Sequence, residues 1–74
     1  MEEMKMYKLK CNNGNETTVN FKNVIGRNQI RTFFANNMYA IMDSEFESIL
    51  EMQHGETLEF YFPNNIKHIT VVCE

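Results

Sequence analysis

The side chains of this sequence that could act together chemically are carboxylates gathered in one stretch. Residues 43–60, DSEFESILEMQHGETLEF, contain five glutamates and the only aspartate of the chain. Two carboxylates can act as acid and base in glycoside hydrolysis when a cleft holds them around a substrate, but a 74-residue chain rarely forms such a cleft. Carboxylates on an exposed surface can instead attract a basic partner. The acidic stretch therefore favours binding over catalysis.

Sequence patterns that would indicate catalysis or metal binding are missing. The chain has no Gly-x-Ser-x-Gly elbow, no glycine-rich phosphate loop and no His-Glu-x-x-His pair. Structural zinc sites use closely spaced ligand pairs, and the four soft metal ligands are dispersed: Cys11, His54, His68 and Cys73. We therefore expect a protein that is not an enzyme and that binds no metal and no cofactor.

Charge is divided unevenly along the chain. Residues 1–42 carry six lysines and arginines against three glutamates, whereas residues 43–74 carry seven acidic residues against Lys67. The net charge is −3 and the isoelectric point is about 5.3. Clustered charge steers association and repels partners of the same sign. The C-terminal part therefore predicts a protein partner with a basic surface, and the overall acidity disfavours direct nucleic-acid binding.

The elements that must position the acidic stretch include a first β-hairpin. Residues 4–11 and 16–24 both alternate apolar with polar side chains, which is the period of half-buried strands. A two-residue Asn-Gly turn would pair residues of opposite faces, so we predict a three-residue loop at 13–15. The expected pairs are Tyr7 with Phe21 and Leu9 with Val19.

A second hairpin is predicted in the C-terminal sequence FYFPNNIKHITVVC. Pro63 fits the first central position of a type I turn, and Asn65 can adopt the left-handed conformation. A three-residue loop at 63–65 also places the apolar residues of the preceding strand on one face. The expected pairs are Phe62 with Ile66, Phe60 with His68 and Leu58 with Thr70.

A helix is predicted over residues 44–54, within the acidic stretch. Ser44 and Glu47 have the spacing of a capping box, and Glu45 and Glu47 lie in the first turn, where the helix dipole favours anions. Gly55 suits the end of the helix. Helical spacing places three apolar residues on one face: Phe46, Ile49 and Leu50.

Residues 24–42 fit two alternative structures. Ile30, Phe33 and Phe34 have the spacing of a short helix. The same segment is rich in Ile, Thr and Phe, which also favour a strand joined to a second strand at 38–42. We favour the two strands and leave the helix followed by a strand as the alternative.

The chain as a whole is predicted to form one α+β domain, residues 1–74. Its core is a small antiparallel β-sheet built from hairpins, with the helix of residues 44–54 packed on one face. A domain of this size buries only about 60% of its unfolded surface, so a homo-oligomer is a further expectation. The two cysteines and the absence of an apolar leader or a long apolar run predict a cytoplasmic protein.

The predicted contact surface combines carboxylates with apolar or aromatic neighbours, as interface anchors do. Met52 is expected on the polar side of the helix, and Tyr61 on the same strand face as Glu59. Met38, Tyr39 and Met42 fit the same contact surface, but such side chains more often fill the core. The predicted partner-binding residues are Glu47, Glu51, Glu56, Glu59, Tyr61 and Met52.

The function expected from these features is that of an inhibitor or regulator without enzymatic activity. Its acidic face would bind a basic, nucleic-acid-handling protein, with carboxylates in the place of phosphates. In size, charge and lack of catalytic motifs the chain is similar in type to small phage-encoded inhibitors of bacterial defence enzymes. The alternatives are a dimer that binds a nucleotide or other small ligand and a direct nucleic-acid binder, and their candidate residues are Arg27, Arg31, Lys8 and Lys10.

Overall fold

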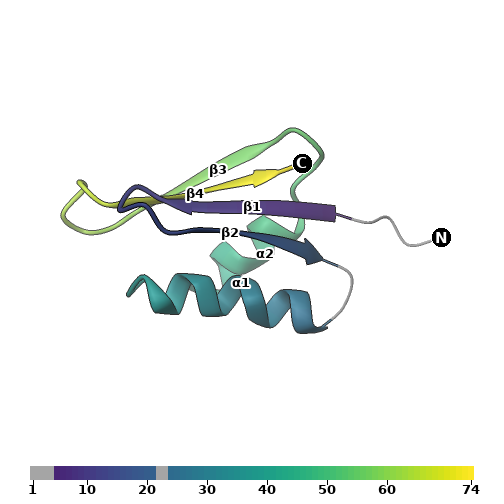
Figure 1. The fold of residues 1–74 in the computed structure, drawn as a ribbon, viewed down its shortest axis with the longest axis horizontal. Coiled ribbons are helices and arrows are strands. Elements are labelled where there is room, and N and C mark those ends of the chain that lie inside the picture. The colour runs from purple at the N-terminus through teal and green to yellow at the C-terminus, as the bar shows by residue number, and fades with distance from the viewer. Residues whose placement is uncertain (1–4, 22–23) are drawn as a thin grey trace.

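A computed structural model describes residues 5–21 and 24–74 of the chain. Its elements, in order, are β1 (Lys5–Cys11), β2 (Glu16–Phe21), α1 (Val24–Asn36), α2 (Asp43–Leu50), β3 (Thr57–Tyr61) and β4 (His68–Cys73). The strands form one antiparallel sheet in the order β2-β1-β4-β3. Figure 1 shows both helices on the same side of this sheet. The predicted α+β architecture is therefore confirmed, with a second helix that we did not favour.

The core lies between the sheet and the two helices. Successive side chains of a strand point to opposite faces, so every second residue of β1 and β4 enters the core. These residues are fully buried, namely Tyr7, Leu9, Cys11, Ile69, Val71 and Cys73. The helices contribute Ile30, Phe34, Phe46 and Ile49. The sheet consequently has one face covered by helices and one face without them.

The first hairpin has the predicted faces but a different register. Its observed pairs are Tyr7 with Val19 and Leu9 with Thr17, so the predicted pairing was wrong by two residues. The N–H of Cys11 donates to the carbonyl of Asn15 at 2.8 Å, which makes residues 12–14 the loop. Gly14 has a φ of 105°, and a three-residue loop needs such a residue at its end rather than at its centre.

The second hairpin has a four-residue loop, 63–66, so its predicted register was wrong by one residue. Asn65 is left-handed as predicted, with φ 60°, and its N–H donates to Phe62 to close the turn. The side-chain oxygen of Asn64 accepts hydrogen bonds from the N–H groups of Ile66 and Lys67, which keeps Ile66 within the loop. The observed pairs are Phe60 with Ile69, Leu58 with Val71 and Tyr61 with His68. His68 therefore lies beside Tyr61 on the uncovered face.

Residues 24–36 form a helix, so the two strands favoured for this segment were wrong. Ile30 and Phe34 are fully buried and Phe33 is nearly so. Helical spacing carries these three side chains to the covered face of the sheet, and that burial outweighs the strand preference of Ile, Thr and Phe. Residues 38–42, which were expected to form a strand, form neither a strand nor a helix.

The end of α1 is a Schellman motif. The N–H of Met38 donates to the carbonyl of Ala35 at 2.9 Å, and the N–H of Tyr39 donates to that of Phe34 at 2.8 Å. The Tyr39 and Phe34 rings pack edge to face with centroids 5.4 Å apart, which is the apolar contact usual for this motif. Met38 has a φ of 63° and occupies the position that is usually glycine.

The helix predicted at 44–54 is shorter, and its cap differs from the predicted one. It begins at Asp43 and ends at Leu50. The carboxylate of Glu45 accepts the N–H of Met42 at 3.0 Å, so Glu45 and not Glu47 closes the first turn. The predicted apolar face is correct, because Phe46 and Ile49 are buried.

The sheet fixes the last turn of α2. The Lys5 ammonium donates to the carbonyls of Leu50 at 3.1 Å and Met52 at 2.8 Å. The Tyr7 hydroxyl donates to the carbonyl of Ile49 at 2.9 Å. These β1 side chains donate to carbonyls at and just beyond the end of α2, where a helix leaves carbonyls without intrahelical donors, and so they anchor that end on β1.

Candidate functional site

The structure divides the predicted partner-binding residues between two faces. Glu47 is exposed on α2 and Glu51 directly after it, and α2 lies on the helical side of the sheet (Figure 1). Glu59 and Tyr61 project from β3 on the uncovered face. Met52 is only 3% exposed, so its predicted place on the polar side of the helix was wrong. The helix ends before Met52, and the chain then turns this side chain into the core.

Two other carboxylates support local structure. Glu56 accepts the N–H of Gln53 and so holds the turn before β3. Glu45 caps α2 with one oxygen and accepts the Tyr39 hydroxyl at 2.6 Å with the other. Burial, followed by the hydrogen bond and charge of Glu45, raises the pKa of Tyr39 to about 12. Of the predicted acidic residues, Glu59 is hydrogen-bonded to the exposed Tyr61.

A groove of about 420 Å³ lies where the segment after α1 meets the end of β3. Its lining is largely apolar or aromatic and includes a single carboxylate: Met38, Tyr39, Ala40, Met42, Glu45, Tyr61, Phe62 and Pro63. Met38 is 87% exposed, Met42 61% and Tyr61 50%. Large flexible and aromatic side chains exposed together are typical of protein interfaces. We call this set of residues the methionine groove.

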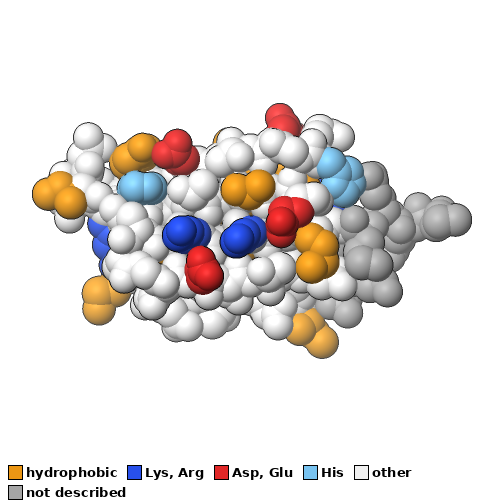
Figure 2. Space-filling model, turned by 45° about the horizontal axis from the view of Figure 1, so that its top comes forward, with side chains coloured by type: hydrophobic (Ala, Val, Ile, Leu, Met, Phe, Trp, Pro, Cys, Tyr) orange, Lys and Arg blue, Asp and Glu red, His pale blue; other side chains and the backbone are white. Residues whose placement is uncertain are grey.

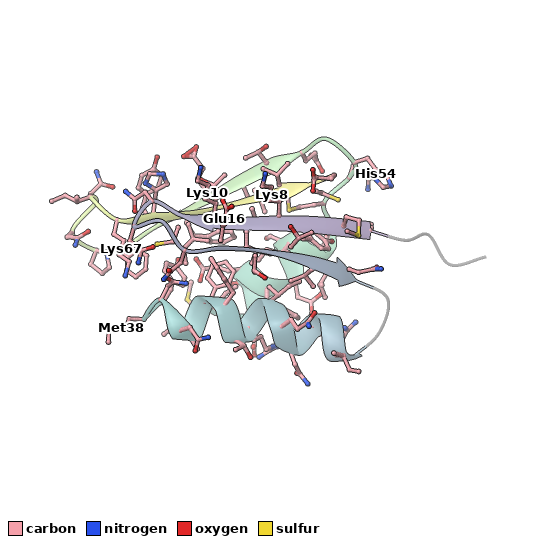
Figure 3. The ribbon with its side chains drawn as sticks, in the orientation of Figure 1. Lys8, Lys10, Glu16, Met38, His54 and Lys67 are labelled. Atoms are coloured by element: carbon pink, nitrogen blue, oxygen red, sulfur yellow. The ribbon has the colours of Figure 1, made fainter. Side chains whose placement is uncertain are left out.

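Met38 is the most unusual residue of the groove. Figure 3 shows its side chain projecting from the end of α1, away from the protein. It is a non-glycine residue with φ 63°, a conformation that costs roughly 1 kcal/mol or more. Since the side chain is 87% exposed, burial in this chain does not offset that cost. The sequence alone could not show this, because it depends on where α1 ends.

Tyr61 connects the methionine groove to the uncovered face of the sheet. Its hydroxyl donates to the carboxylate of Glu59 at 2.9 Å, and this bond, with the charge of Glu59, raises the pKa of Tyr61. The ring lies against that of His68, with centroids 5.1 Å apart and a tilt of 31°. Nδ1 of His68 is buried without a hydrogen-bond partner among the described residues.

The uncovered face carries mixed charge. Lys8 and Lys10 project from β1 on this face, opposite α1 (Figure 3). Neither ammonium has a hydrogen-bond or ion-pair partner among residues 5–21 and 24–74. Glu16 and Glu59 share the face, and Figure 2 shows acidic side chains close to two basic ones near its centre. A single-strand binding surface needs a continuous basic groove, and this face does not provide one.

The other predicted cationic residues, Arg27 and Arg31, are exposed on α1 in the helical layer. Arg31 lies over the ring of Phe46 at 4.3 Å and 3.8 Å from Asp43, so it links the two helices. The structure therefore does not bring the four predicted cations together. A second hollow, of about 400 Å³, runs along α1 beside Thr17 and Phe33, and neither arginine lines it.

The soft metal ligands are also dispersed in the structure. Cys11 and Cys73 are buried and form no disulfide. Within the part of the chain that the structure describes, no three cysteine, histidine or acidic side chains are close enough to hold a metal ion. In the same described ranges, no helix has the length and apolar character needed to cross a membrane.

No protein-family model, no curated protein and no solved structure matches this chain.

Proposed function

We propose that this protein is a non-enzymatic binding module whose methionine groove and adjoining Glu59 contact a basic protein. The observation that carries the proposal is Met38, which is 87% exposed and left-handed at a helix end where glycine is usual. Non-glycine residues held in such backbone conformations cluster at functional sites. An apolar side chain held outward at a cost in stability supports a role in contacting another molecule.

The charge around the methionine groove favours a basic partner. Glu45 lines the groove, and Glu59 is hydrogen-bonded to Tyr61 at its edge. The net charge of −3 repels acidic partners over a longer range. Apolar anchors supply the binding energy in such an interface, whereas surrounding carboxylates increase the association rate and set specificity.

The most specific form of this proposal is an inhibitor of a nucleic-acid-handling protein. A basic groove that binds phosphates would also accept Glu59 and nearby carboxylates beside the exposed methionines. The uncovered face disfavours the direct nucleic-acid binder, because Glu16 and Glu59 lie among its lysines. The ligand-binding dimer at Arg27 and Arg31 remains a prediction, and neither side chain lines the methionine groove or the hollow beside Thr17 and Phe33.

The proposal is tested by affinity capture with matched variants, followed by binding measurements on the purified partner. Wild type, Met38→Ser/Met42→Ser and Ile66→Ser are compared; Ile66 is 78% exposed but lies outside the groove. We expect a basic protein whose Kd rises about tenfold or more for the double variant and stays unchanged for Ile66→Ser. A partner that binds all three proteins equally, or whose binding does not weaken with salt, would contradict the proposal.

A further inference from the structure

β3 is an edge strand with unused backbone hydrogen-bonding groups. Phe62 donates its N–H to Lys67, and Glu56 accepts the N–H of Cys73, so even-numbered residues of this segment face β4. In an antiparallel ladder the alternate residues point their N–H and C=O groups the other way. The outward groups belong to Thr57, Glu59 and Tyr61. None of their N–H groups has a hydrogen-bond partner among the described residues.

The surroundings of this edge have a defined chemistry. The methionine groove lies at the Tyr61 end of β3. Glu59 projects on the uncovered face, and Glu45 lines the groove on the helical side. A strand added to β3 would direct its side chains alternately to these two sides. Each side offers a carboxylate, and the groove also offers apolar contacts.

We infer that an extended segment of the basic partner pairs with β3 as a fifth strand of the sheet. Backbone hydrogen bonds to Thr57, Glu59 and Tyr61 supply affinity, as in other cases of strand addition. Basic side chains of the segment lie near Glu59 and Glu45, and an apolar side chain enters the methionine groove. This inference rests on the proposed function and specifies how the partner chain binds.

Charge favours a basic segment over a second copy of this chain. Full antiparallel overlap of two β3 strands would place Glu59 directly opposite Glu59 of the other copy. Like charges at directly opposed positions destabilise a strand pair, and exposed edge strands commonly use charge to prevent self-pairing. Glu59 therefore disfavours edge-to-edge self-association and attracts lysine or arginine at the same position.

The test uses random decapeptides displayed on phage and selected on the intact protein. We expect selected sequences in which lysine or arginine alternates with apolar residues. The tightest peptide is then synthesised and titrated into wild type, Thr57→Pro and Thr57→Val. Proline at the first residue of an edge strand removes only an outward N–H, whereas valine keeps it. Peptide binding should weaken about tenfold in Thr57→Pro and stay within about twofold in Thr57→Val.

A second measurement does not depend on folding of the proline variant. Two forms of the selected peptide are made, one N-methylated at its odd-numbered residues and the other at its even-numbered residues, and each is titrated into wild type. Only one of these two phases of methylation removes the N–H groups that would face β3. We expect one phase to abolish binding and the other to preserve it. Basic peptides that bind equally in both phases, and equally to both Thr57 variants, overturn strand addition but leave the proposed function standing. Selection of peptides that are not basic, or of none, overturns both.

Discussion

The hydroxyl of Tyr39 donates a hydrogen bond of 2.6 Å to a carboxylate oxygen of Glu45, whose other oxygen accepts the N–H of Met42. One carboxylate thus joins the segment after α1 to the start of α2 and holds the base of the methionine groove. Met38 directly precedes Tyr39 and Met42 donates its N–H to Glu45, so these two hydrogen bonds hold the segment that carries both methionines.

The first prediction concerns this connection. Glu45→Ala should lower the free energy of unfolding by about 1–2 kcal/mol, because it removes an N-terminal cap and the partner of a tyrosine hydroxyl. Glu47→Ala, on the exposed side of the same helix, should change it by less than about 0.5 kcal/mol. Urea denaturation measures both. Equal losses in the two variants would show that helix propensity, not the connection, is responsible.

The second prediction concerns alkaline pH. Burial, and to a smaller extent the charge of nearby Cys73, raises the pKa of Tyr7 to about 12 from 10.0. Above pH 10 the unfolded chain loses this proton while the folded protein keeps it, so the stabilising difference disappears as the pH rises towards 12. That loss amounts to about 3 kcal/mol. Urea titrations should give a shallower fall between pH 10 and 12 for Tyr7→Phe than for wild type.

The same variant has a separate effect at neutral pH. Tyr7→Phe removes the side-chain donor of the Ile49 carbonyl, which still accepts the N–H of Met52 at 3.2 Å, so stability should fall by about 0.5–1.5 kcal/mol. Between pH 7 and 9 the stability curves of wild type and variant should run parallel. Curves that stay parallel up to pH 12 would contradict the raised pKa of Tyr7.

The third prediction concerns Asn37, a buried amide that is 3% exposed. Its Oδ1 accepts bonds from Asn13 at 3.3 Å and Asn15 at 2.8 Å, and its Nδ2 donates to Phe33 at 2.9 Å. Asn37→Leu should destabilise the protein by about 2–4 kcal/mol, because it breaks a buried network. Asn13→Ala removes the long bond to Asn37 and an exposed bond that Asn13 Oδ1 accepts from the Asn15 N–H at 3.0 Å, and should cost about 1 kcal/mol. Similar urea midpoints for both variants would contradict the central role of Asn37.

The sequence predicted those features that depend on local periodicity. Alternation placed Tyr7, Leu9 and Cys11 on the buried face, and helical spacing placed Phe46 and Ile49 in the core. Both registers were wrong. In the first hairpin the positive φ lies at Gly14, at the end of the loop and not at its centre. In the second hairpin Asn65 has the predicted positive φ, but the Asn64 side chain binds the N–H groups of Ile66 and Lys67 and the loop is one residue longer. The strand prediction for the α1 segment was wrong because β-branched and aromatic residues favour strands by local preference. The core contacts that favour a helix there come from distant parts of the chain.

The candidate site was predictable only in part. Glu59 and Tyr61 share a strand face, as their spacing of two indicates. Met38 and Met42 line the same groove as Tyr61 because of where α1 ends and α2 begins. The buried position of Met52 likewise depends on where α2 ends. Such neighbours arise from the packing of distant elements, which periodicity in the sequence does not record.

The fourth prediction separates the two groups of carboxylates. Glu59→Lys should raise the Kd for a basic peptide or partner by about tenfold, because Glu59 adjoins the methionine groove. Glu47→Lys/Glu51→Lys should change it by less than about twofold, because both residues are exposed and neither lines the groove, and an ionic strength of about 0.15 M screens exposed charges over about 8 Å. Calorimetric titration of each variant measures the effect. A larger loss for the Glu47/Glu51 variant would move the contact surface to α2.

The fifth prediction is that one substitution, at Met38, raises stability and weakens binding. Met38→Gly should raise the free energy of unfolding by about 1 kcal/mol, because glycine adopts φ near 63° without strain and the exposed side chain contributes no burial. The same change should weaken binding of a basic partner several-fold, since it removes a groove anchor. Asn65→Gly is the matched control, because Asn65 also has positive φ, at 60°, but lies outside the groove.

Both glycine variants should therefore be at least as stable as wild type, and only Met38→Gly should bind less tightly. Urea denaturation and calorimetric titration on the same samples separate the two effects. A loss of stability in Met38→Gly would mean that the methionine side chain stabilises the fold. The exposure of Met38 would then not support partner binding. Unchanged binding in a more stable Met38→Gly would remove the main support for the proposed function, because the strain at Met38 would have no compensating role.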